Sequence, residues 1–289
     1  MKIVLAAVIC VLIAAGCSSG LLSREASSPA ACRGQVLDVT GNKIWVDRQG
    51  VGATTVVFEA GFGNDSTVWT DFSKIEQKVR ALGFQTLIYD RAGMGKSLMN
   101  EAEKYSLAND ARILSSVLDQ CAIQGPIVIV AHSYGGAIAL ATAVDTGDVK
   151  GLVLLDAVIP GVWDHGELEH TLSLMLPELP KIKEEDPVLA KVAVPFFESL
   201  QSIYAEIKGK RLDRRIPIVD IVAGDGQNGE KSAQVWRTAH RNFVAEDPKN
   251  RTLYSGKRRT ARGARAVGQH PDPPPPNRLT PSCCTRPDP

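Results

Sequence analysis

The sequence lacks an excess of charge of either sign. Its 289 residues contain 33 lysines and arginines against 32 aspartates and glutamates, which gives a formal net charge of +1. A protein that binds nucleic acid through its phosphates usually carries a basic stripe. The balance therefore indicates no nucleic-acid partner, and the 44% of hydrophobic residues suffices for a sizeable core in one large α/β domain or two small ones.

The apolar run at the N-terminus is too short to cross a membrane. Residues 3–15 have the length of a signal-peptide core, well below the roughly 20 residues that a membrane-spanning helix needs. The run ends in Ala-Ala-Gly-Cys, which resembles a bacterial lipoprotein box in which Cys17 is lipidated and becomes the mature N-terminus. Ala14 stands where leucine is usual in that box. A plain secretory signal, with an incidental Cys17, is the alternative.

The lipoprotein interpretation sets the expected location and the first two segments of the chain. It predicts a signal peptide over residues 1–16, a flexible tether over residues 17–34, and a lipid anchor that holds the protein at the cell envelope, outside the cytoplasm. Outside the cytoplasm Cys32 and Cys121 could form a disulfide. Two separate buried thiols are the alternative, and Cys283 and Cys284 receive no role.

Strand and helix patterns alternate over residues 35–254. Apolar stretches separated by helical periodicity predict a mostly parallel sheet with helices on both faces. Residues 157–212 are helical and interrupted by prolines, which predicts a cap over one edge of the sheet. A single helix is expected over residues 71–83. Residues 255–289 are rich in arginine and proline without hydrophobic periodicity, so we expect a disordered tail.

One short segment carries a candidate nucleophile. Residues 127–140 run from an apolar strand through Ala-His-Ser-Tyr-Gly-Gly into a helix of small residues. This pattern predicts that Ser133 lies on a sharp turn between strand and helix. A serine hydroxyl is a weak nucleophile, so it needs a base and a group that orients the base. A chance serine at a glycine-rich helix start is the alternative.

Three motifs in this order resemble the α/β-hydrolase superfamily over residues 35–254. They are the Ser133 turn, Glu-Ala-Gly-Phe-Gly-Asn-Asp at 59–65, and Tyr-Asp-Arg-Ala-Gly-Met-Gly-Lys-Ser at 89–97. Ala131 occupies the first position of the usual Gly-x-Ser-x-Gly motif.

The resemblance implies an α/β-hydrolase fold with a helical cap and an oxyanion hole beside the nucleophile. The hole would be formed by the backbone N–H groups of Tyr134 and Phe62. A simple glycine turn is the alternative for the Phe62 loop. We expect Asp90 and Arg91 to form an internal salt bridge.

The acid of the expected triad has two candidates. Many relatives carry it three residues beyond a glycine after the strand that follows the cap; here that position is Gln227, and Asp225 is displaced from it. Asp156 ends the strand that follows the Ser133 helix, and an apolar strand that ends in a carboxylate needs a partner for it. A helix or turn cap is the alternative role for Asp156.

The base is the weakest part of the resemblance. The five histidines are His132, His165, His170, His240 and His270. His132 is expected to point away from Ser133, His165 and His170 to face solvent in the cap, and His240 comes too early in the chain. His270 alone is late enough, but it lies in the proline-rich tail.

A shifted reading frame offers a second explanation. Read one nucleotide late, the codons of residues 264–271 can encode His-Glu-Leu-Trp-Asp-Asn-Ile-Pro, preceded by glycine. That resembles the family's ending, in which Gly-His comes before a proline that opens a final helix. We therefore expect a frameshift near residue 255. The basic run over residues 257–265 would then result from translation in the wrong frame and would not be a binding patch for an anionic surface.

The sequence thus predicts a serine hydrolase at the cell envelope. Its expected substrate is a small acyl ester with an apolar group, and neither a metal nor an organic cofactor is implied. The alternative is a catalytically impaired or non-enzymatic lipoprotein of the same fold that binds a ligand or a partner. Fold alone does not decide between them.

Overall fold

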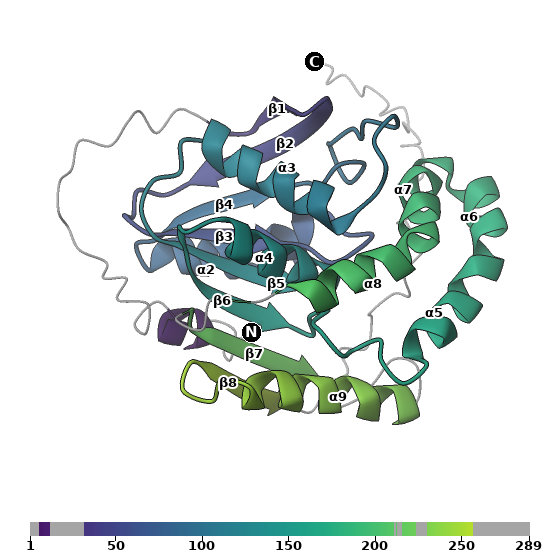
Figure 1. Ribbon diagram of the computed structural model, residues 1–289. Coiled ribbons are helices and arrows are strands. Elements are labelled where there is room, and N and C mark those ends of the chain that lie inside the picture. Colours follow the sequence, from purple (N-terminus) through teal and green to yellow (C-terminus); the bar gives the residue numbers. More distant parts are fainter. Residues whose placement is uncertain (1–5, 12–31, 211, 213–215, 224–229, 257–289) are drawn as a thin grey trace, which may run out of the picture. The chain divides into compact units, whose positions relative to one another are not determined.

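Eight strands form one sheet in the order β1-β2-β4-β3-β5-β6-β7-β8 (Figure 1). The computed structural model describes residues 6–11, 32–210, 212, 216–223 and 230–256. The strands are β1 (Gln35–Val39), β2 (Asn42–Gln49), β3 (Thr55–Glu59), β4 (Gln85–Tyr89), β5 (Ile127–His132), β6 (Val149–Leu155), β7 (Ile218–Ala223) and β8 (Arg251–Gly256). Strand β2 runs antiparallel to β1 and β4, and the other pairs are parallel. The predicted α/β class with a mostly parallel sheet is confirmed.

Helices connect the strands. They are η1 (Val68–Phe72), α2 (Ile75–Ala81), α3 (Leu107–Gln120), α4 (Tyr134–Asp145), α5 (Glu167–Met175), η2 (Leu176–Glu178), α6 (Leu179–Glu185), α7 (Pro187–Glu198), α8 (Leu200–Gly209) and α9 (Glu230–Ala245). The single helix expected over residues 71–83 is wrong, because Lys74 adopts a left-handed conformation, with φ 52°, that ends η1 before α2 begins.

Alternate residues of the central strands enter two separate cores. On β5, Ile129 and Ala131 pack with residues of α3 and α4, whereas Val128 and Val130 pack with residues of α2. Figure 1 shows α3 and α4 in front of the sheet and α2 behind it. Because both faces are covered, these strands are apolar at nearly every position rather than alternating.

Residues 6–11, within the predicted signal peptide, form a short helix on the α2 face of the sheet. Ala7, Val8 and Val11 are buried there, and a Cβ added to Gly151 on β6 would clash with Val11. Among the described residues, none of the helices combines the length and the hydrophobicity needed to cross a bilayer. Cys17 and the tether up to residue 31 lie outside the described residues, so the lipid anchor stays a prediction.

Helices α5 to α8 lie between β6 and β7 in the chain and at the carboxyl ends of the parallel strands (Figure 1). Helix α7 begins where the side chain of Asp186 accepts a hydrogen bond of 2.9 Å from the N–H of Leu189, an N-cap that satisfies one free helix donor. Phe196 and Phe197, near the end of α7, are buried. Helix α7 of the cap thereby contributes two aromatic side chains to the protein interior.

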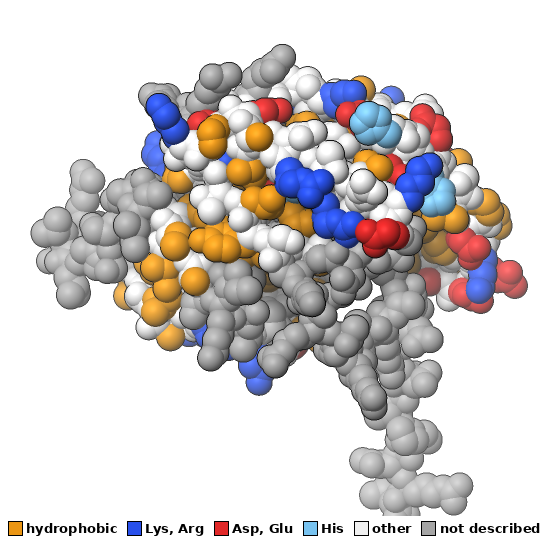
Figure 2. Space-filling model, turned by 90° about the horizontal axis from the view of Figure 1, so that it is seen from below, with side chains coloured by type: hydrophobic (Ala, Val, Ile, Leu, Met, Phe, Trp, Pro, Cys, Tyr) orange, Lys and Arg blue, Asp and Glu red, His pale blue; other side chains and the backbone are white. Residues whose placement is uncertain are grey.

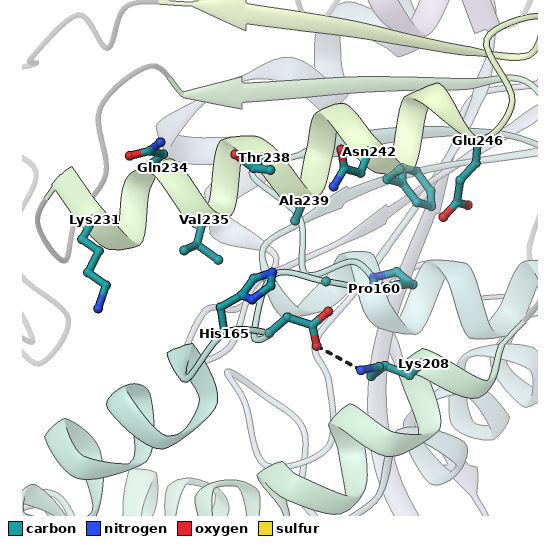
Figure 3. Close-up of a pocket in the computed structure, with 13 residues that line it drawn as sticks. Pro160, His165, Lys208, Lys231, Gln234, Val235, Thr238, Ala239, Asn242 and Glu246 are labelled. Carbon is teal, nitrogen blue, oxygen red and sulfur yellow. Dashed lines mark hydrogen bonds and ion pairs between the residues drawn. The ribbon is translucent and has the colours of Figure 1, made fainter.

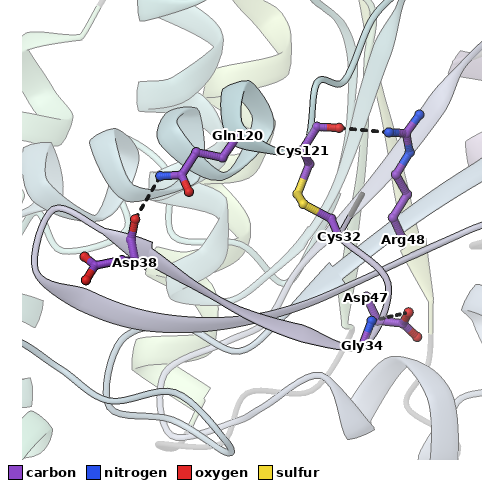
Figure 4. Close-up of a disulfide and its surroundings, with 7 residues drawn as sticks. All are labelled: Cys32, Gly34, Asp38, Asp47, Arg48, Gln120 and Cys121. Atoms are coloured by element: carbon purple, nitrogen blue, oxygen red, sulfur yellow. Dashed lines mark hydrogen bonds between the residues drawn. A yellow bond between two sulfur atoms is a disulfide. The ribbon is translucent and has the colours of Figure 1, made fainter. Parts of the chain in front are cut away.

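A disulfide joins Cys32, before β1, to Cys121, at the end of α3 (Figure 4). The two Cα atoms are 5.4 Å apart. Arg48 on β2 contacts both ends of this link: its N–H donates to the carbonyl of Cys32 at 2.7 Å, and its guanidinium donates to the carbonyl of Cys121 at 2.8 Å. The link ties the outer antiparallel hairpin of the sheet to the helix that covers it.

Candidate active site

Ser133 lies on the sharp turn between β5 and α4. Its φ and ψ are 51° and −126°, a conformation that costs a residue with a side chain about 1–3 kcal/mol. The N–H of Ser133 donates to Leu155 at 3.1 Å, and its carbonyl accepts from Gly136 at 2.9 Å and from Val158 at 2.7 Å. These bonds hold the strained turn, which places the hydroxyl at the carboxyl edge of the sheet.

Small residues around the turn allow helix α4 to approach the sheet. A Cβ added to Gly135 would lie 2.6 Å from the carbonyl oxygen of Ala60, and one added to Gly136 would clash with Ala157. Ala131, in the first position of the motif, is fully buried. The small residues of this motif, Ala131, Gly135 and Gly136, are therefore required by close packing of the helix on the sheet.

The loop after β3 lies directly against Ser133. A Cβ added to Gly61 would lie 3.1 Å from Ser133 Cβ and 2.7 Å from His132 Nδ1, so both side chains border the same glycine. His132 and Ser133 therefore both lie against the loop after β3. In the part of the chain that the structure describes, the N–H groups of Phe62 and Tyr134 donate to no other group. Each of these N–H groups is available to a substrate oxygen.

A buried ion pair lies beside this loop. Arg91 donates to the Glu59 carboxylate at 2.9 Å, and the two side chains are 5% and 0% exposed. The salt bridge expected between Asp90 and Arg91 is wrong: Asp90 instead accepts backbone N–H bonds from Ser66 at 2.8 Å and Lys96 at 2.9 Å. Arg91 is free to turn inward because these backbone donors satisfy its neighbour.

Burial raises the pKa of Glu59 to about 7, although the charge of Arg91 and a hydrogen bond from the Tyr89 hydroxyl both oppose the rise. The same burial raises the pKa of Asp110 on α3, again against the charge of Arg91. Asp110 accepts a hydrogen bond of 2.8 Å from the Tyr134 hydroxyl. The residue after the nucleophile is thus anchored through its side chain.

Aromatic rings cover the Phe62 loop. The Phe62 ring stacks on Phe196 of α7 with centroids 4.1 Å apart, and it meets the edge of Phe197 at 5.6 Å. Phe196 also contacts the rings of Tyr134 at 4.8 Å and Tyr105 at 5.7 Å. The cap and the loop therefore form one apolar cluster directly beside the candidate nucleophile.

Asp156, one of the two acid candidates, lies at the carboxyl end of β6. Its N–H donates to the carbonyl of Ile221 at 2.8 Å, and its carboxylate accepts from the N–H of Ala223 at 2.7 Å. Its φ of 44° aims the side chain across the end of β7. Asp225 and His270, the other acid candidate and the base candidate, lie outside the described residues.

A buried histidine–carboxylate pair joins α9 to β7. His240 on α9 and Asp220 on β7 are both completely buried, with Nδ1 and Oδ2 2.7 Å apart. Burial raises the pKa of Asp220, and the hydrogen bond from His240 opposes the rise. Asp220 is in register with Leu154, which is in register with Ala131. Two strand spacings, roughly 10 Å, therefore separate Asp220 from the strand that carries Ser133.

A groove of about 450 Å³ runs along α9, but it is separate from Ser133. Thr238, Ala239 and Asn242 of α9 line one side of it, and Pro160 and His165 line the other (Figure 3).

On the face seen from below, basic side chains lie beside acidic ones rather than in a single stripe (Figure 2). Within the described ranges, no group of three or more metal-binding side chains comes together.

The geometry around Ser133 agrees with the match of the sequence to a known family. The model of the Alpha/beta hydrolase family matches residues 56–277, a range that includes the Ser133 turn, the Phe62 loop and the cap. The chain belongs to the alpha/beta hydrolase family. The resemblance inferred from the three motifs is confirmed at this level.

Curated relatives of this alpha/beta hydrolase include proteins with and without a named reaction. The uncharacterized protein YqjL of Bacillus subtilis is 27% identical over 201 residues, which cover 68% of this chain and 73% of that protein. A 2-hydroxy-6-oxononadienedioate/2-hydroxy-6-oxononatrienedioate hydrolase of Cupriavidus pinatubonensis is 32% identical over 115 residues, which cover 39% of each chain. The chain thus aligns with well under half of that enzyme.

Solved alpha/beta hydrolases share the fold at low sequence identity. A carboxylesterase-related structure from Nitrososphaera gargenis has a TM-score of 0.56 at 17% identity and covers 80% of this chain and 89% of its own. An esterase from Exiguobacterium antarcticum has a TM-score of 0.54 at 18% identity and covers 77% of this chain and 90% of its own. These similarities support the fold.

The sequence alone did not reveal three residues of the site, Glu59, Phe196 and Phe197, nor the buried Asp220 outside it. Glu59 was quoted only as part of a motif, although a carboxylate that ends an apolar strand already signals a buried partner. Phe196 and Phe197 carry no signal that aims them at Ser133. Asp220 is a charged residue inside the strand Ile-Val-Asp-Ile-Val-Ala, a position that predicts a buried polar pair.

Proposed function

We propose that this alpha/beta hydrolase is a serine hydrolase that cleaves an acyl ester or a related carbonyl bond. The supporting observation is the strained Ser133 turn beside the Phe62 loop: a Cβ added to Gly61 would lie 3.1 Å from Ser133 Cβ, and in the described part of the chain the N–H groups of Phe62 and Tyr134 donate to no backbone carbonyl. A hydroxyl near two such donors suits the attack on a carbonyl, because the donors stabilise the negative oxygen that the attack creates.

The proposed reaction proceeds in two steps. Ser133 Oγ attacks the acyl carbon while a base takes its proton, and the alcohol leaves with that proton as the acyl-enzyme forms. Water then attacks the acyl-enzyme, which releases the acid and restores Ser133. We assign the base to a histidine of the C-terminal segment, either His270 or one encoded in the shifted frame, and its orientation to Asp156 or Asp225.

The aromatic cluster and the relatives support a small ester with an apolar group. Phe62, Phe196 and Phe197 form an apolar wall beside the nucleophile, and an apolar acyl or alkyl chain would bury its surface there. The structural relatives include an esterase. We place the enzyme at the cell envelope through the Cys17 anchor, and the Cys32–Cys121 disulfide supports an oxidising compartment.

Hydrolysis of a nitrophenyl butyrate tests the catalytic part of the proposal. The full chain, Ser133→Ala and Ser173→Ala are compared; Ser173 is an exposed serine of α5 and serves as the matched control. We expect turnover by the wild type and by Ser173→Ala, and none above background by Ser133→Ala. Equal rates in all three would contradict the proposal, and the same series built with the one-nucleotide-shifted C-terminus then tests the frame hypothesis.

Incorporation of labelled palmitate tests the location. A wild-type chain that takes up the label in the envelope fraction, together with an unlabelled Cys17→Ala, is the expected result. A wild-type chain without label, recovered in a soluble fraction, would contradict the lipid anchor without affecting the proposed chemistry.

A non-catalytic lipoprotein is the second candidate function. His240 is completely buried against Asp220, and His270, the base candidate, lies outside the described residues. A binding protein of this fold would keep its ligand affinity in Ser133→Ala, and would show no turnover in either reading frame. Turnover by the wild-type chain therefore separates the two functions.

A further inference from the structure

The guanidinium of Arg91 contacts three consecutive residues of the loop beside Ser133. It donates to the Glu59 carboxylate at 2.9 Å, to the carbonyl of Ala60, and to the carbonyl of Gly61 at 2.8 Å. The forked, planar guanidinium can make these bonds together, whereas a lysine ammonium presents only a point charge. Arg91 thus determines where the backbone of this loop lies.

The orientation of the Phe62 N–H follows from the bond to Gly61. The carbonyl of Gly61 and the N–H of Phe62 belong to one peptide unit, and the described part of the chain contains no cis peptide bond. In a planar trans peptide these two groups point in opposite directions. Because Arg91 holds the carbonyl on its own side, the N–H faces away from Arg91.

The other N–H donor is also in contact with Arg91. The guanidinium carbon lies 5.5 Å from the centre of the Tyr134 ring, within the range of a cation–π contact. The Tyr134 hydroxyl is held by Asp110 at 2.8 Å. One buried cation therefore touches both segments that supply the two donors.

Arg91 is itself held by groups that have no contact with the reacting atoms. Glu59 ends β3, one carboxylate oxygen accepts from Arg91, and the other accepts from the Tyr89 hydroxyl on β4. Strands β3 and β4 are paired in register up to this point. Through Arg91 and Glu59, the loop is therefore held in a fixed position relative to the central strands of the sheet.

We propose that Arg91 is a positioning residue for the oxyanion hole, and that the Glu59–Arg91 pair fixes the Phe62 N–H relative to Ser133. This role rests on the proposed serine hydrolase function. It adds two residues that act by holding the loop in place rather than by touching the substrate. An oxyanion forms mainly in the transition state, so loosening the loop lowers kcat more than it raises KM.

The test compares Arg91→Lys with Arg251→Lys in the full chain. Arg251 is a matched control because it is also buried, donates to the carbonyl of Phe243, and pairs with Glu246, but it lies on β8. We expect Arg91→Lys to lower kcat by roughly a hundredfold, the scale of losing one oxyanion donor, with KM changed less than about threefold. Arg251→Lys should leave both constants near wild type.

A second readout follows the oxyanion directly. The inhibition constant of a trifluoromethyl ketone, whose adduct with Ser133 carries the same negative oxygen, should rise in parallel with the loss of kcat in Arg91→Lys. If Arg91→Lys does not fold, the paired change Glu59→Gln with Arg91→Gln removes both buried charges together and should show the same kcat loss in a folded protein.

The outcomes separate the two proposals. A folded Arg91→Lys or paired variant with kcat within twofold of wild type overturns the positioning role while the serine hydrolase stands. An equal kcat loss in Arg251→Lys overturns it as well, because the effect would then be general. No turnover by the wild type in either reading frame overturns the proposed function, and this role with it.

Discussion

Removing the Cys32–Cys121 disulfide should cost a large part of the stability of the protein. The two residues are separated by 89 positions, so the bond closes a long loop in the unfolded chain. The chain-entropy relation for a loop of roughly 90 residues gives about 15.5 cal/mol/K, or about 4.6 kcal/mol at 25 °C. Since small domains unfold with about 5–15 kcal/mol, this is a third or more of the total.

The perturbation is the double change Cys32→Ala and Cys121→Ala. Alanine is chosen over serine because both positions are at most 1% exposed, and a buried hydroxyl without a partner carries its own penalty. The free energy of unfolding is measured by urea denaturation, with the reduced wild type alongside. Cys10→Ala in the uncleaved chain serves as the control, because Cys10 is an exposed free thiol.

We expect the double variant and the reduced wild type to lose a similar amount, and Cys10→Ala to lose none. A loss below about 1 kcal/mol in the double variant would refute the reasoning, because the loop entropy would then be absent or compensated. A large loss in the double variant with none on reduction would show that side-chain packing, rather than the covalent link, is responsible.

Three further predictions concern buried groups. His240→Ala should lower the free energy of unfolding by about 3–5 kcal/mol in urea denaturation, because it leaves the Asp220 carboxylate buried without its partner. Phe196→Ala should lower it by about 3–5 kcal/mol and raise KM for hexanoyl more than for acetyl esters. The free energy of unfolding should fall as pH rises from about 4.5 to about 7, because burial raises the pKa of Glu59 from 4.5 to about 7 and the folded chain then holds a proton that the unfolded chain releases. Glu59→Gln should remove that pH dependence.

Phe196→Ala has a matched control within the chain, and the other two predictions each have an outcome that would contradict them. Phe72 is 82% exposed, so Phe72→Ala should change neither stability nor the preference for acyl length. A His240→Ala variant as stable as the wild type would mean that Asp220 finds another partner or becomes protonated at little cost. An unchanged pH profile in Glu59→Gln would assign the pH dependence to other groups.

Local patterns determined most of the fold. Apolar runs bounded by glycines predicted the strands, and the Ser133 turn predicted the topology around the nucleophile because strand, turn residue and small-residue helix are contiguous in sequence. The helix expected over residues 71–83 failed at Lys74, where a left-handed residue interrupts an otherwise regular periodicity. Periodicity reports which faces are buried and is insensitive to a single backbone angle.

The pairing of buried charges was not predictable in the same way. Asp90 and Arg91 are adjacent in sequence, and adjacency suggested a pair. The sheet instead places Arg91 beside Glu59 on another strand, 32 residues away. The approach of Phe196 to Phe62 likewise depends on how the cap packs over the sheet, which no local pattern specifies.

The strained backbone of Ser133 implies that the fold is less stable with a serine at this turn than it would be with a glycine. Glycine reaches a φ of 51° without a side-chain clash, whereas alanine retains the Cβ that creates it. A Ser133→Gly chain should therefore be about 1 kcal/mol more stable than Ser133→Ala, after the greater flexibility of glycine in the unfolded state is included. Selection for stability alone would favour glycine at this turn. The presence of serine therefore indicates selection for something other than stability.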